Sequence, residues 1–350
     1  MASGSTENTH SVSRVSPCEG SGGIMPPAAG GSSPPAPTPF TPDKVPMKCK
    51  RCGALAAVKL PSHHAGFCPE CFEVFFKRQV ETAVRRHAMI QPGEKVLVAV
   101  SGGKDSLALM RVLSELGHDV EGLHVHLGIP DSSDPVCAKT EAYFRDNGFP
   151  LHVLRMEDVG LAIPAVKAAV RRPICAVCGK IKRHYFNRFA YENGFAALAT
   201  GHNLDDEVAR LFANVLRWDA AYLGGQGPVL PAEGRFVRKI KPLYRVTEFE
   251  TAAYCFFKGI DHWKAGCPYS GGASFTGHKK LFADLEDRSP GQKVAFYEAF
   301  LDRGRPHFAA PNQEGGETLA PCQTCGYPSS SEICGVCRIR AQVEAKAASE

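Results

Sequence analysis

A short stretch that begins at Lys95 (KVLVAVSGGKDSLAL) carries the residue types best suited to hold a phosphate. Val96–Val100 is predicted to be a buried strand, Ser101–Gly103 a glycine turn, and the residues from about Lys104 the start of a helix. The first turn of a helix has unpaired N–H groups and a positive dipole end, and glycine lets a phosphate approach the backbone closely. Lys104 adds charge, and Ser106 adds a hydroxyl donor. This stretch predicts an anion site.

The SGGKDS run resembles the pyrophosphate-loop (PP-loop) signature of the ATP pyrophosphatase superfamily, whose members split ATP into AMP and pyrophosphate. The chain has no G-x-x-x-x-G-K-[ST] run, so the loop is not the usual kinase or GTPase loop. A glycine-rich strand–helix turn without a ligand is the alternative. The resemblance implies an ATP site formed by Ala99, Val100, Ser101, Gly102, Gly103, Lys104, Asp105, Ser106, His126, Gly201 and Asp206, with His126 near the adenine.

A second polar run, Gly201–Glu207 (GHNLDDE), follows another predicted strand. Asn203 can cap the next helix, which puts Asp206 in its first turn. The helix dipole alone favours acidic residues at such positions, so this run also has a purely structural explanation. ATP cleavage needs Mg²⁺, which one or two carboxylates hold together with phosphate oxygens. We expect Asp105 and Asp206 to supply them.

Ten of the fourteen cysteines fall in five C-x-x-C pairs. Without a secretion-signal pattern, such pairs favour metal binding over disulfides. Two pairs near the N-terminus have the spacing of a zinc ribbon, and two near the C-terminus form a tighter knuckle. Four thiolates complete a tetrahedral zinc shell, so His63 and His64 are expected to be surface residues. The predicted ligands are Cys49, Cys52, Cys68 and Cys71 for the first zinc and Cys322, Cys325, Cys334 and Cys337 for the second.

The fifth pair, Cys175 and Cys178, has no second pair beside it, and Cys267 follows about ninety residues later. Three explanations fit this spacing. The three cysteines can hold a [4Fe–4S] cluster with one iron left open. The pair can carry a persulfide, with Cys267 incidental. All three can also be buried free cysteines. The spacing does not decide between them.

The chain has 350 residues, 44% of them hydrophobic, with a net charge of +5 and a pI of about 8.5. No apolar run approaches the ~18–20 residues of a membrane span. We therefore expect a cytoplasmic protein with no membrane partner. The mild positive charge permits a nucleic-acid partner without requiring one. Lys239, Lys241 and Arg245 could contact RNA phosphates or form a solvated basic face.

Strands and helices alternate through the middle of the chain, which predicts an α/β fold. We expect an open, mostly parallel sheet with helices on both faces and ligands beyond the carboxyl ends of the strands. The expected strands after the first are 120–127, 151–155 and 196–200, and the expected helices are about 106–116, 135–147, 180–192, 205–216 and within 278–305. The expected regions are a disordered leader (1–46), a zinc ribbon (47–72), a linking helix (73–93), the catalytic domain (94–310), a second ribbon (311–340) and a tail (341–350).

SGGKDS, GHNLDDE, the three central cysteines and a cysteine ribbon at each end together resemble the tRNA 2-thiouridine synthetases, from about Met47 to about Arg340. The nearest branch modifies the T-loop 5-methyluridine of bacterial tRNA, and the wobble-uridine thiolases are close relatives. Some members have His where this chain has Cys71. The resemblance implies a [4Fe–4S] cluster on Cys175, Cys178 and Cys267, and Lys182 as a source of stabilising charge. It also implies a thiocarboxylated ubiquitin-like sulfur carrier, or free sulfide, and a homodimer.

The expected activity is ATP-dependent tRNA 2-thiolation, with Asp105, Lys182 and Asp206 as the catalytic residues. Uridine O2 attacks the α-phosphate, pyrophosphate leaves, and sulfur then attacks C2 to give 2-thiouridine and AMP. The expected cofactors are ATP, Mg²⁺, the cluster and two Zn²⁺. Alternatives are 2-thiolation of the wobble uridine, 2-thiocytidine synthesis, an amidating synthetase of the same superfamily, and a non-enzymatic zinc-ribbon RNA-binding protein.

Overall fold

The computed structural model describes residues 47–270, 275–308 and 319–349. The predicted leader, 1–46, lies outside the described residues. No helix within those ranges is long and apolar enough to cross a bilayer.

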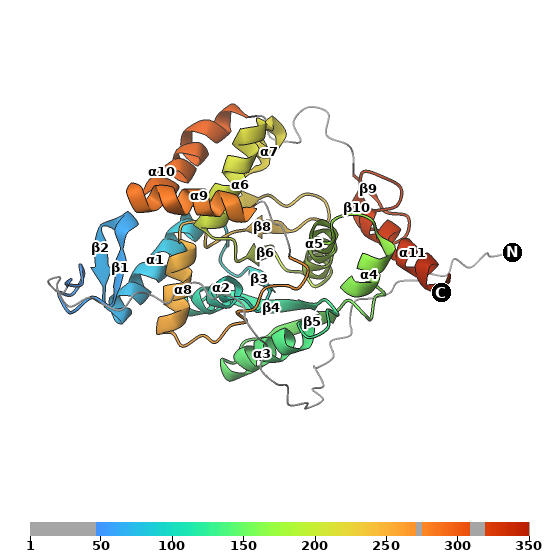
Figure 1. Ribbon diagram of the computed structural model, residues 1–350, viewed down its shortest axis with the longest axis horizontal. Helices are drawn as coiled ribbons and strands as arrows, with labels where there is room; N and C mark the ends of the chain where they lie inside the picture. The colour runs from blue at the N-terminus through green and yellow to red at the C-terminus, as the bar shows by residue number, and fades with distance from the viewer. Residues whose placement is uncertain (1–46, 271–274, 309–318, 350) are drawn as a thin grey trace.

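A six-stranded sheet forms the centre of the molecule, with strand order β5-β4-β3-β6-β8-β7 (Figure 1). Five strands run parallel, and β7 pairs antiparallel with β8 at one edge. The chain leaves β3 toward β4 on one side and later returns to β6 on the other, so the strand order reverses between β3 and β6. Ligands of open α/β sheets bind at such a reversal. The strands are β3 (Lys95–Val100), β4 (Asp119–His126), β5 (Leu151–Arg155), β6 (Ala197–Thr200), β7 (Val229–Leu230) and β8 (Arg238–Ile240).

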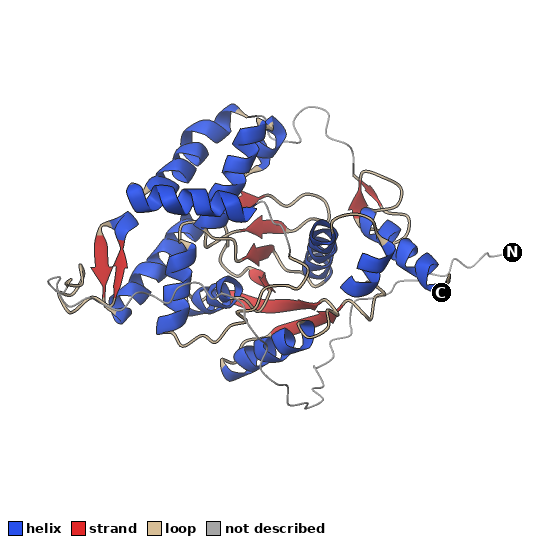
Figure 2. Ribbon diagram, in the orientation of Figure 1, coloured by secondary structure: helices blue, strands red, loops and turns tan. Residues whose placement is uncertain are grey.

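The sheet separates two hydrophobic cores, because side chains alternate across each strand. Val96, Val98 and Val100 enter the larger core, while Leu97 enters the smaller one. Helices cover both faces (Figure 2). Those contributing to the larger core are α1 (Pro69–Arg86), α2 (Lys104–Glu115), α3 (Ser133–Asp146), α6 (Leu204–Arg217), α7 (Ala220–Gly225), α8 (Glu248–Phe257), α9 (Phe275–Arg288) and α10 (Gln292–Ala299); those of the smaller core are α4 (Ile163–Ala169), α5 (Ile174–Glu192) and α11 (Gly335–Ala347).

The two cysteine ribbons lie at opposite ends of the molecule (Figure 1). The N-terminal ribbon contains the hairpin of β1 (Val58–Leu60) and β2 (Ala65–Phe67). The C-terminal ribbon contains the short pair β9 (Ala320–Pro321) and β10 (Pro328–Ser329). Each ribbon joins a different core.

The predicted fold class is confirmed, and most predicted elements lie within two residues of the observed ones. The main error is in α5, which begins at Ile174 rather than near Lys180. Its start is earlier because Val177, Ile181 and Tyr185 continue one buried stripe at helical spacing. Cys175 and Cys178 therefore lie in the first turns of a helix. The linking helix α1 is also displaced, since it begins at Pro69 and ends at Arg86. The segment predicted as a tail, 341–350, begins inside α11.

Candidate active site

The SGGKDS loop adopts the strand–turn–helix geometry that the sequence predicts. Gly102 has φ of 79°, and a Cβ on it would lie 2.6 Å from Val136 Cγ1, so glycine is required there. The Ser106 hydroxyl donates to Gly103 O at 2.9 Å and accepts from Ser101 N at 3.2 Å. These bonds close the turn and direct the first N–H groups of α2 outward from the end of β3.

The second polar run packs directly against this loop. A Cβ on Gly201 would lie 3.0 Å from the backbone carbon of Asp105 and 3.0 Å from Ser106 N. No side chain fits there without moving the backbone. The two predicted motifs therefore meet at the reversal of strand order between β3 and β6.

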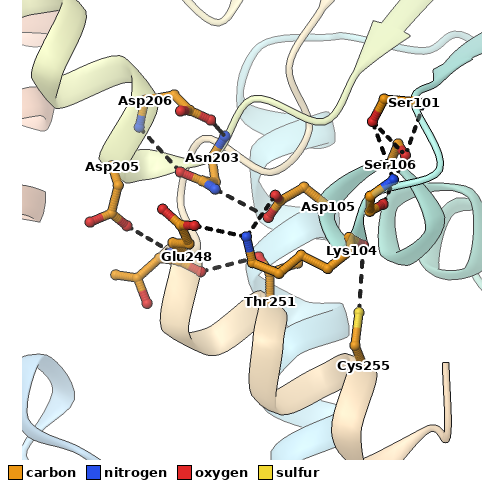
Figure 3. Close-up of polar contacts among 12 residues, drawn as sticks. Ser101, Lys104, Asp105, Ser106, Asn203, Asp205, Asp206, Glu248, Thr251 and Cys255 are labelled. Atoms are coloured by element: carbon orange, nitrogen blue, oxygen red, sulfur yellow. Dashed lines mark hydrogen bonds and ion pairs between the residues drawn. The ribbon is translucent and has the colours of Figure 1, made fainter. Parts of the chain in front are cut away.

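Asn203 joins the two predicted magnesium ligands (Figure 3). Its Oδ1 accepts from Asp206 N and its Nδ2 donates to Asp105 Oδ1, both at 3.1 Å. Asp206 Oδ2 accepts in return from Asn203 N at 3.1 Å, which completes a capping box at the start of α6. Burial raises the pKa of the Asp105 carboxyl, although Lys104 and Asn203 act in the opposite direction. The predicted pair of carboxylates is thus held on one polar bridge.

Two lysines and Glu248 extend this network. Lys104 Nζ lies 3.0 Å from Asp105 Oδ2 and 2.8 Å from Glu248 Oε1. Lys279 Nζ, from α9, lies 2.6 Å from Asp206 Oδ1 and 3.1 Å from Glu248 Oε2. Burial alone would raise the pKa of Glu248, but the two lysines lower it to about 2. Glu248 is therefore a stable carboxylate between two ammonium groups.

Sequence reasoning did not identify Glu248 or Lys279 as site residues. Thr247 and Glu250 form a capping box at the start of α8, and the T-x-x-E spacing could have located that helix start. Nothing in the local sequence indicates that Glu248, the residue after Thr247, lies beside the phosphate loop. Lys279 comes from a segment predicted only as helical.

The other two acids of the GHNLDDE run are buried and pair with interior side chains. Asp205 Oδ1 accepts from Lys293 Nζ at 2.5 Å. The fully buried Glu207 accepts from Lys241 Nζ at 2.7 and 2.8 Å and from the Tyr297 hydroxyl at 2.7 Å. Of the three consecutive acids, Asp206 is the one that shares Asn203 as a hydrogen-bond partner with Asp105 of the loop.

These pairs also change the expectation for the basic residues near β8. Lys241 is committed to Glu207, and Arg245 pairs with Glu298 and donates to Gln79 at 3.2 Å. Because these ion pairs are internal, neither residue forms an open basic face for RNA. Burial lowers the pKa of Lys239, which is half-buried.

Cys255 lies directly beneath the phosphate loop. Its Sγ donates to Lys104 O at 3.5 Å, and its side chain is buried (Figure 3). Burial raises the pKa of this thiol to about 12, and the charge of Asp105 adds to the effect. A protonated thiol of this kind packs as a small apolar group.

His126 ends β4, one strand away from the loop. Its Nε2 lies 3.0 Å from Asp134 Oδ1, while its Nδ1 is buried without a hydrogen-bond partner among the described residues. A buried, unsatisfied ring nitrogen is costly unless a ligand pairs with it. No described contact joins His126 to the loop residues, so the structure places it beside the site rather than in the network.

Two segments bring the three central cysteines together. Cys175 Sγ, on α5, donates to Tyr269 O at 3.2 Å. Tyr269 lies two residues after Cys267 in the chain. Burial raises the pKa of Cys178, the charges of Cys267 and Cys175 add to the effect, and Lys182 opposes it. Cys175, Cys267 and Lys182 thus lie near enough to Cys178 for their charges to act on its thiol.

The same cysteine segment contacts the phosphate loop. Trp263 N donates to Gly102 O at 2.9 Å, four residues before Cys267. Lys182 also lowers the pKa of His124 on β4, where burial is the main cause of a pKa of about 4. The cysteines and the loop therefore lie at the same edge of the sheet.

Both predicted zinc sets are assembled. In each, the four Sγ atoms lie within 4.8 Å of one another. Cys52 Sγ and Cys68 Sγ are 3.7 Å apart, as are those of Cys325 and Cys334. Tetrahedral zinc with bonds of about 2.3 Å requires Sγ separations of about 3.8 Å. Among the described residues, no third set of cysteine, histidine or acidic side chains is this compact, so the four-sulfur arrangement is specific to the two ribbons.

His63 and His64 lie outside these zinc sets. His64 is exposed, as predicted, but His63 is half-buried and lies 3.0 Å from Glu250 Oε1 on α8. The N-terminal ribbon thus contacts the helix that begins with Glu248.

The parallel sheet and the loop at its strand reversal define a PP-loop protein, and comparisons with known proteins agree. Residues 73–265 match the PP-loop domain family, and residues 48–73 match the N-terminal LIM domain of the 2-thiouridine synthetase TtuA. The structure is similar to the U34-tRNA thiolase NcsA from Methanococcus maripaludis with its [4Fe-4S] cluster. That match has a TM-score of 0.72 and 26% identity and covers 85% of this chain and 96% of the other.

Named relatives narrow the class further. The chain is 40% identical over 297 residues to the tRNA-5-methyluridine(54) 2-sulfurtransferase of Pyrococcus horikoshii, covering 83% of this chain and 93% of that protein. It is 40% identical over 296 residues to the protein of the same name from Thermus thermophilus, covering 84% and 91%. The chain belongs to this family of tRNA sulfurtransferases.

Proposed function

We propose that this protein catalyses ATP-dependent 2-thiolation of tRNA at the T-loop 5-methyluridine, position 54. The names of its relatives support this target. The observation that carries the proposal is the 2.9 Å hydrogen bond from Trp263 N to Gly102 O. It holds the Cys267 segment against the phosphate loop, so base activation and sulfur delivery can act on one nucleotide.

ATP and Mg²⁺ fit the residues at the loop. The first N–H groups of α2, with the Lys104 ammonium, would bind the departing pyrophosphate and stabilise its charge. Ser101 and Ser106 would shape the loop, since Ser101 N donates to Ser106 Oγ and Gly103 N donates to Ser101 Oγ. Asp105 and Asp206 would hold Mg²⁺. The unpaired Nδ1 of His126 supports a role for this residue toward the adenine.

A [4Fe–4S] cluster fits the chemistry of the central cysteines, since two segments supply three thiols and Cys175 Sγ donates to Tyr269 O, only two residues beyond Cys267. Cys175, Cys178 and Cys267 would hold it, and the cluster would supply an open iron site for sulfur. Lys182, beside Cys178, would stabilise the negative charge that develops when sulfur attacks C2 of the adenylated uridine.

Zinc fits both ribbons because the sulfur separations suit a tetrahedral ion. The N-terminal ribbon also supports contact with RNA. A hollow of about 600 Å³ on it is lined by exposed Lys48, Lys50 and Lys59, away from the loop. We infer that these lysines contact tRNA phosphates while the uridine enters the site.

The sulfur carrier and the homodimer stay predictions from the family resemblance. The exposure of Cys175 and Cys267 is consistent with delivery by a carrier protein. A cytoplasmic location is supported by relatives named cytoplasmic tRNA 2-thiolation protein 1.

The decisive experiment is mass spectrometry of tRNA nucleosides after anaerobic incubation of tRNA with the protein, ATP, Mg²⁺ and sulfide, with the modified position mapped. We expect 2-thio-5-methyluridine at position 54 and one AMP per sulfur. Asp206→Ala should lower the rate by at least about a hundredfold while leaving iron and zinc contents unchanged. Thiolation at the wobble uridine or at cytidine would contradict the target, and full activity of Asp206→Ala would contradict the mechanism.

A further inference from the structure

The carboxylate of Glu248 occupies a position at which two lysines converge. Lys104 Nζ contacts one oxygen at 2.8 Å, and Lys279 Nζ contacts the other at 3.1 Å. The two lysines come from different elements, α2 and α9. Lys104 belongs to the phosphate loop, so the shared anion lies at the mouth of that loop (Figure 3).

The Glu248 carboxylate is held by its two ion pairs with lysine and remains partly exposed. Its side chain is 46% exposed, the most exposed of this network, against 28% for Asp206 and 26% for Asp105. Its backbone N–H donates to Asp205 Oδ2 at 2.7 Å, which fixes the main chain independently of the carboxylate. The carboxylate can therefore rotate into solvent while α8 stays in place, because rotamer changes of exposed side chains are fast.

The same geometry ties Lys279 to the metal ligand. Lys279 Nζ lies 2.6 Å from Asp206 Oδ1, so this ammonium neutralises the carboxylate that would bind Mg²⁺. When Mg²⁺ takes over Asp206, Lys279 loses its shortest ionic contact and keeps a charge that needs another anion. An ATP polyphosphate bound at the loop would supply that anion.

We propose that Lys279 is an ATP-binding residue that contacts the polyphosphate together with Lys104, and that Glu248 occupies this anion position until the nucleotide binds. This inference rests on the proposed function for the ATP site. It adds Lys279, a cation from outside the SGGKDS loop, to the ATP site. It also makes the Glu248 carboxylate an anion that competes with the polyphosphate. The raised pKa values of both lysines keep them charged throughout the working pH range.

Calorimetric titration with ATP, pyrophosphate and AMP, each with Mg²⁺, tests the inference on the full chain. For Lys279→Ala we expect about a tenfold weaker affinity for ATP and pyrophosphate, since a charge-assisted contact is lost. AMP affinity should be unchanged, and Lys279→Arg should recover most of the loss. Lys280→Ala is the matched control, because Lys280 is 81% exposed on the same helix and lies 4.0 Å from Asp284.

Glu248→Gln gives the opposite and more diagnostic result. Removing the competing negative charge should tighten pyrophosphate binding several-fold, although the substitution disrupts two ion pairs. Weaker pyrophosphate binding by Glu248→Gln, or equal loss of ATP and AMP affinity in Lys279→Ala, would overturn the inference and indicate a structural role. Should Lys279→Ala not fold, the sign of the Glu248→Gln change decides.

Failure of the proposed function has a different signature. In that case the wild-type protein itself would not bind ATP or pyrophosphate, or would bind them without thiolating tRNA. Wild-type binding with unchanged affinity in Lys279→Ala would overturn only the assignment of Lys279.

Discussion

The N-terminal and C-terminal ribbons use the same four-cysteine arrangement, yet they contact opposite halves of the active site. The N-terminal ribbon leads into α1 and lies against α8, which carries Glu248 beside the phosphate loop. The C-terminal ribbon packs on α5, which carries Cys175, Cys178 and Lys182. One ribbon thus lies against the helix that borders the proposed nucleotide site, and the other lies against the helix that carries the cysteines proposed to deliver sulfur.

The two contacts differ in chemistry as well. On the N-terminal side, Lys77 lies 2.9 Å from Glu115 on α2. Lys258, which follows the last residue of α8, lies 2.9 Å from Glu73 and 3.0 Å from Glu115. His63 adds its 3.0 Å approach to Glu250. This side combines a network of charges among α1, α2 and α8 with aromatic packing, since the Phe76 ring stacks on that of Tyr254 at 4.2 Å.

The C-terminal side depends on rings and apolar packing. The Tyr327 ring lies 4.1 Å from that of His184 on α5, and Arg340 donates to the Tyr185 hydroxyl at 2.7 Å. Val336 and Ile339 join the smaller core with Val177 and Ile181. The comparison teaches that both four-cysteine ribbons are attached by apolar and aromatic packing, to which the N-terminal side adds a network of ion pairs.

Loss of a zinc ligand should have the largest effect and should separate the two ribbons. Cys334→Ser is expected to lower iron content and thiolation while ATP affinity is retained, because α5 loses its support. Cys68→Ser is expected to weaken ATP binding while iron is retained. Each should lower Tm by roughly 5–10 °C. Iron analysis and calorimetry on both variants provide the check, and equal loss of iron from both would remove the distinction.

A smaller effect is expected where rings join the C-terminal ribbon to α5. Tyr327→Ala removes the contact with His184 and a second ring contact, with Phe236 at 5.4 Å. Aromatic pairs contribute about 0.5–1.5 kcal/mol each, so the loss of two pairs should lower the free energy of unfolding by roughly 1–3 kcal/mol. Tyr327→Phe keeps the ring and is the control. A loss as large in the control would assign the effect to the hydroxyl instead.

Acid should weaken the ion pairs on the N-terminal side and leave the aromatic contacts of the C-terminal ribbon intact. Burial alone would raise the pKa of Glu115, but hydrogen bonds from Arg111, Lys77 and Lys258 lower it to about 2, below its ordinary 4.5. A lowered carboxyl pKa stabilises the fold above pH 4.5, and this contribution is lost as the pH falls from 4.5 toward 2. Urea unfolding of wild type and Glu115→Gln should show a difference at pH 7 that shrinks by pH 3.5 and in high salt. The Tyr327→Ala difference should stay constant under the same change.

The smallest effect is expected at the direct contact between the N-terminal ribbon and α8. His63→Ala removes the 3.0 Å contact with Glu250 Oε1, and a polar contact near the surface typically contributes about 0.5 kcal/mol. We expect an unchanged Tm within about 2 °C and at most a twofold change in ATP affinity, with His64→Ala as the exposed neighbour for comparison. A larger loss of ATP affinity would show that the ribbon positions Glu248.

Much of this organisation was predictable because its signals are local. The loop at Ser101, the cap at Asn203 and the two zinc ribbons each follow from residue types within a short window. Local spacing could not show where Glu248 and Lys279 lie, since they reach the loop from later segments through tertiary packing. Local spacing can also suggest exposure where there is none. The sequence around Lys241 suggested a surface charge, but this lysine forms an ion pair with the buried Glu207.

Cys255 gives the molecule a property useful at the bench. Its thiol is buried against Lys104 O and its pKa is raised to about 12, so it is a poor nucleophile at neutral pH. Alkylating probes applied to the folded, cluster-free protein should therefore mark Cys175 and Cys267, which are exposed, and leave Cys255 unmodified. A rise in Cys255 labelling would then report opening of the loop. The rate of Cys255 alkylation can therefore be used to follow changes in the loop when a nucleotide binds.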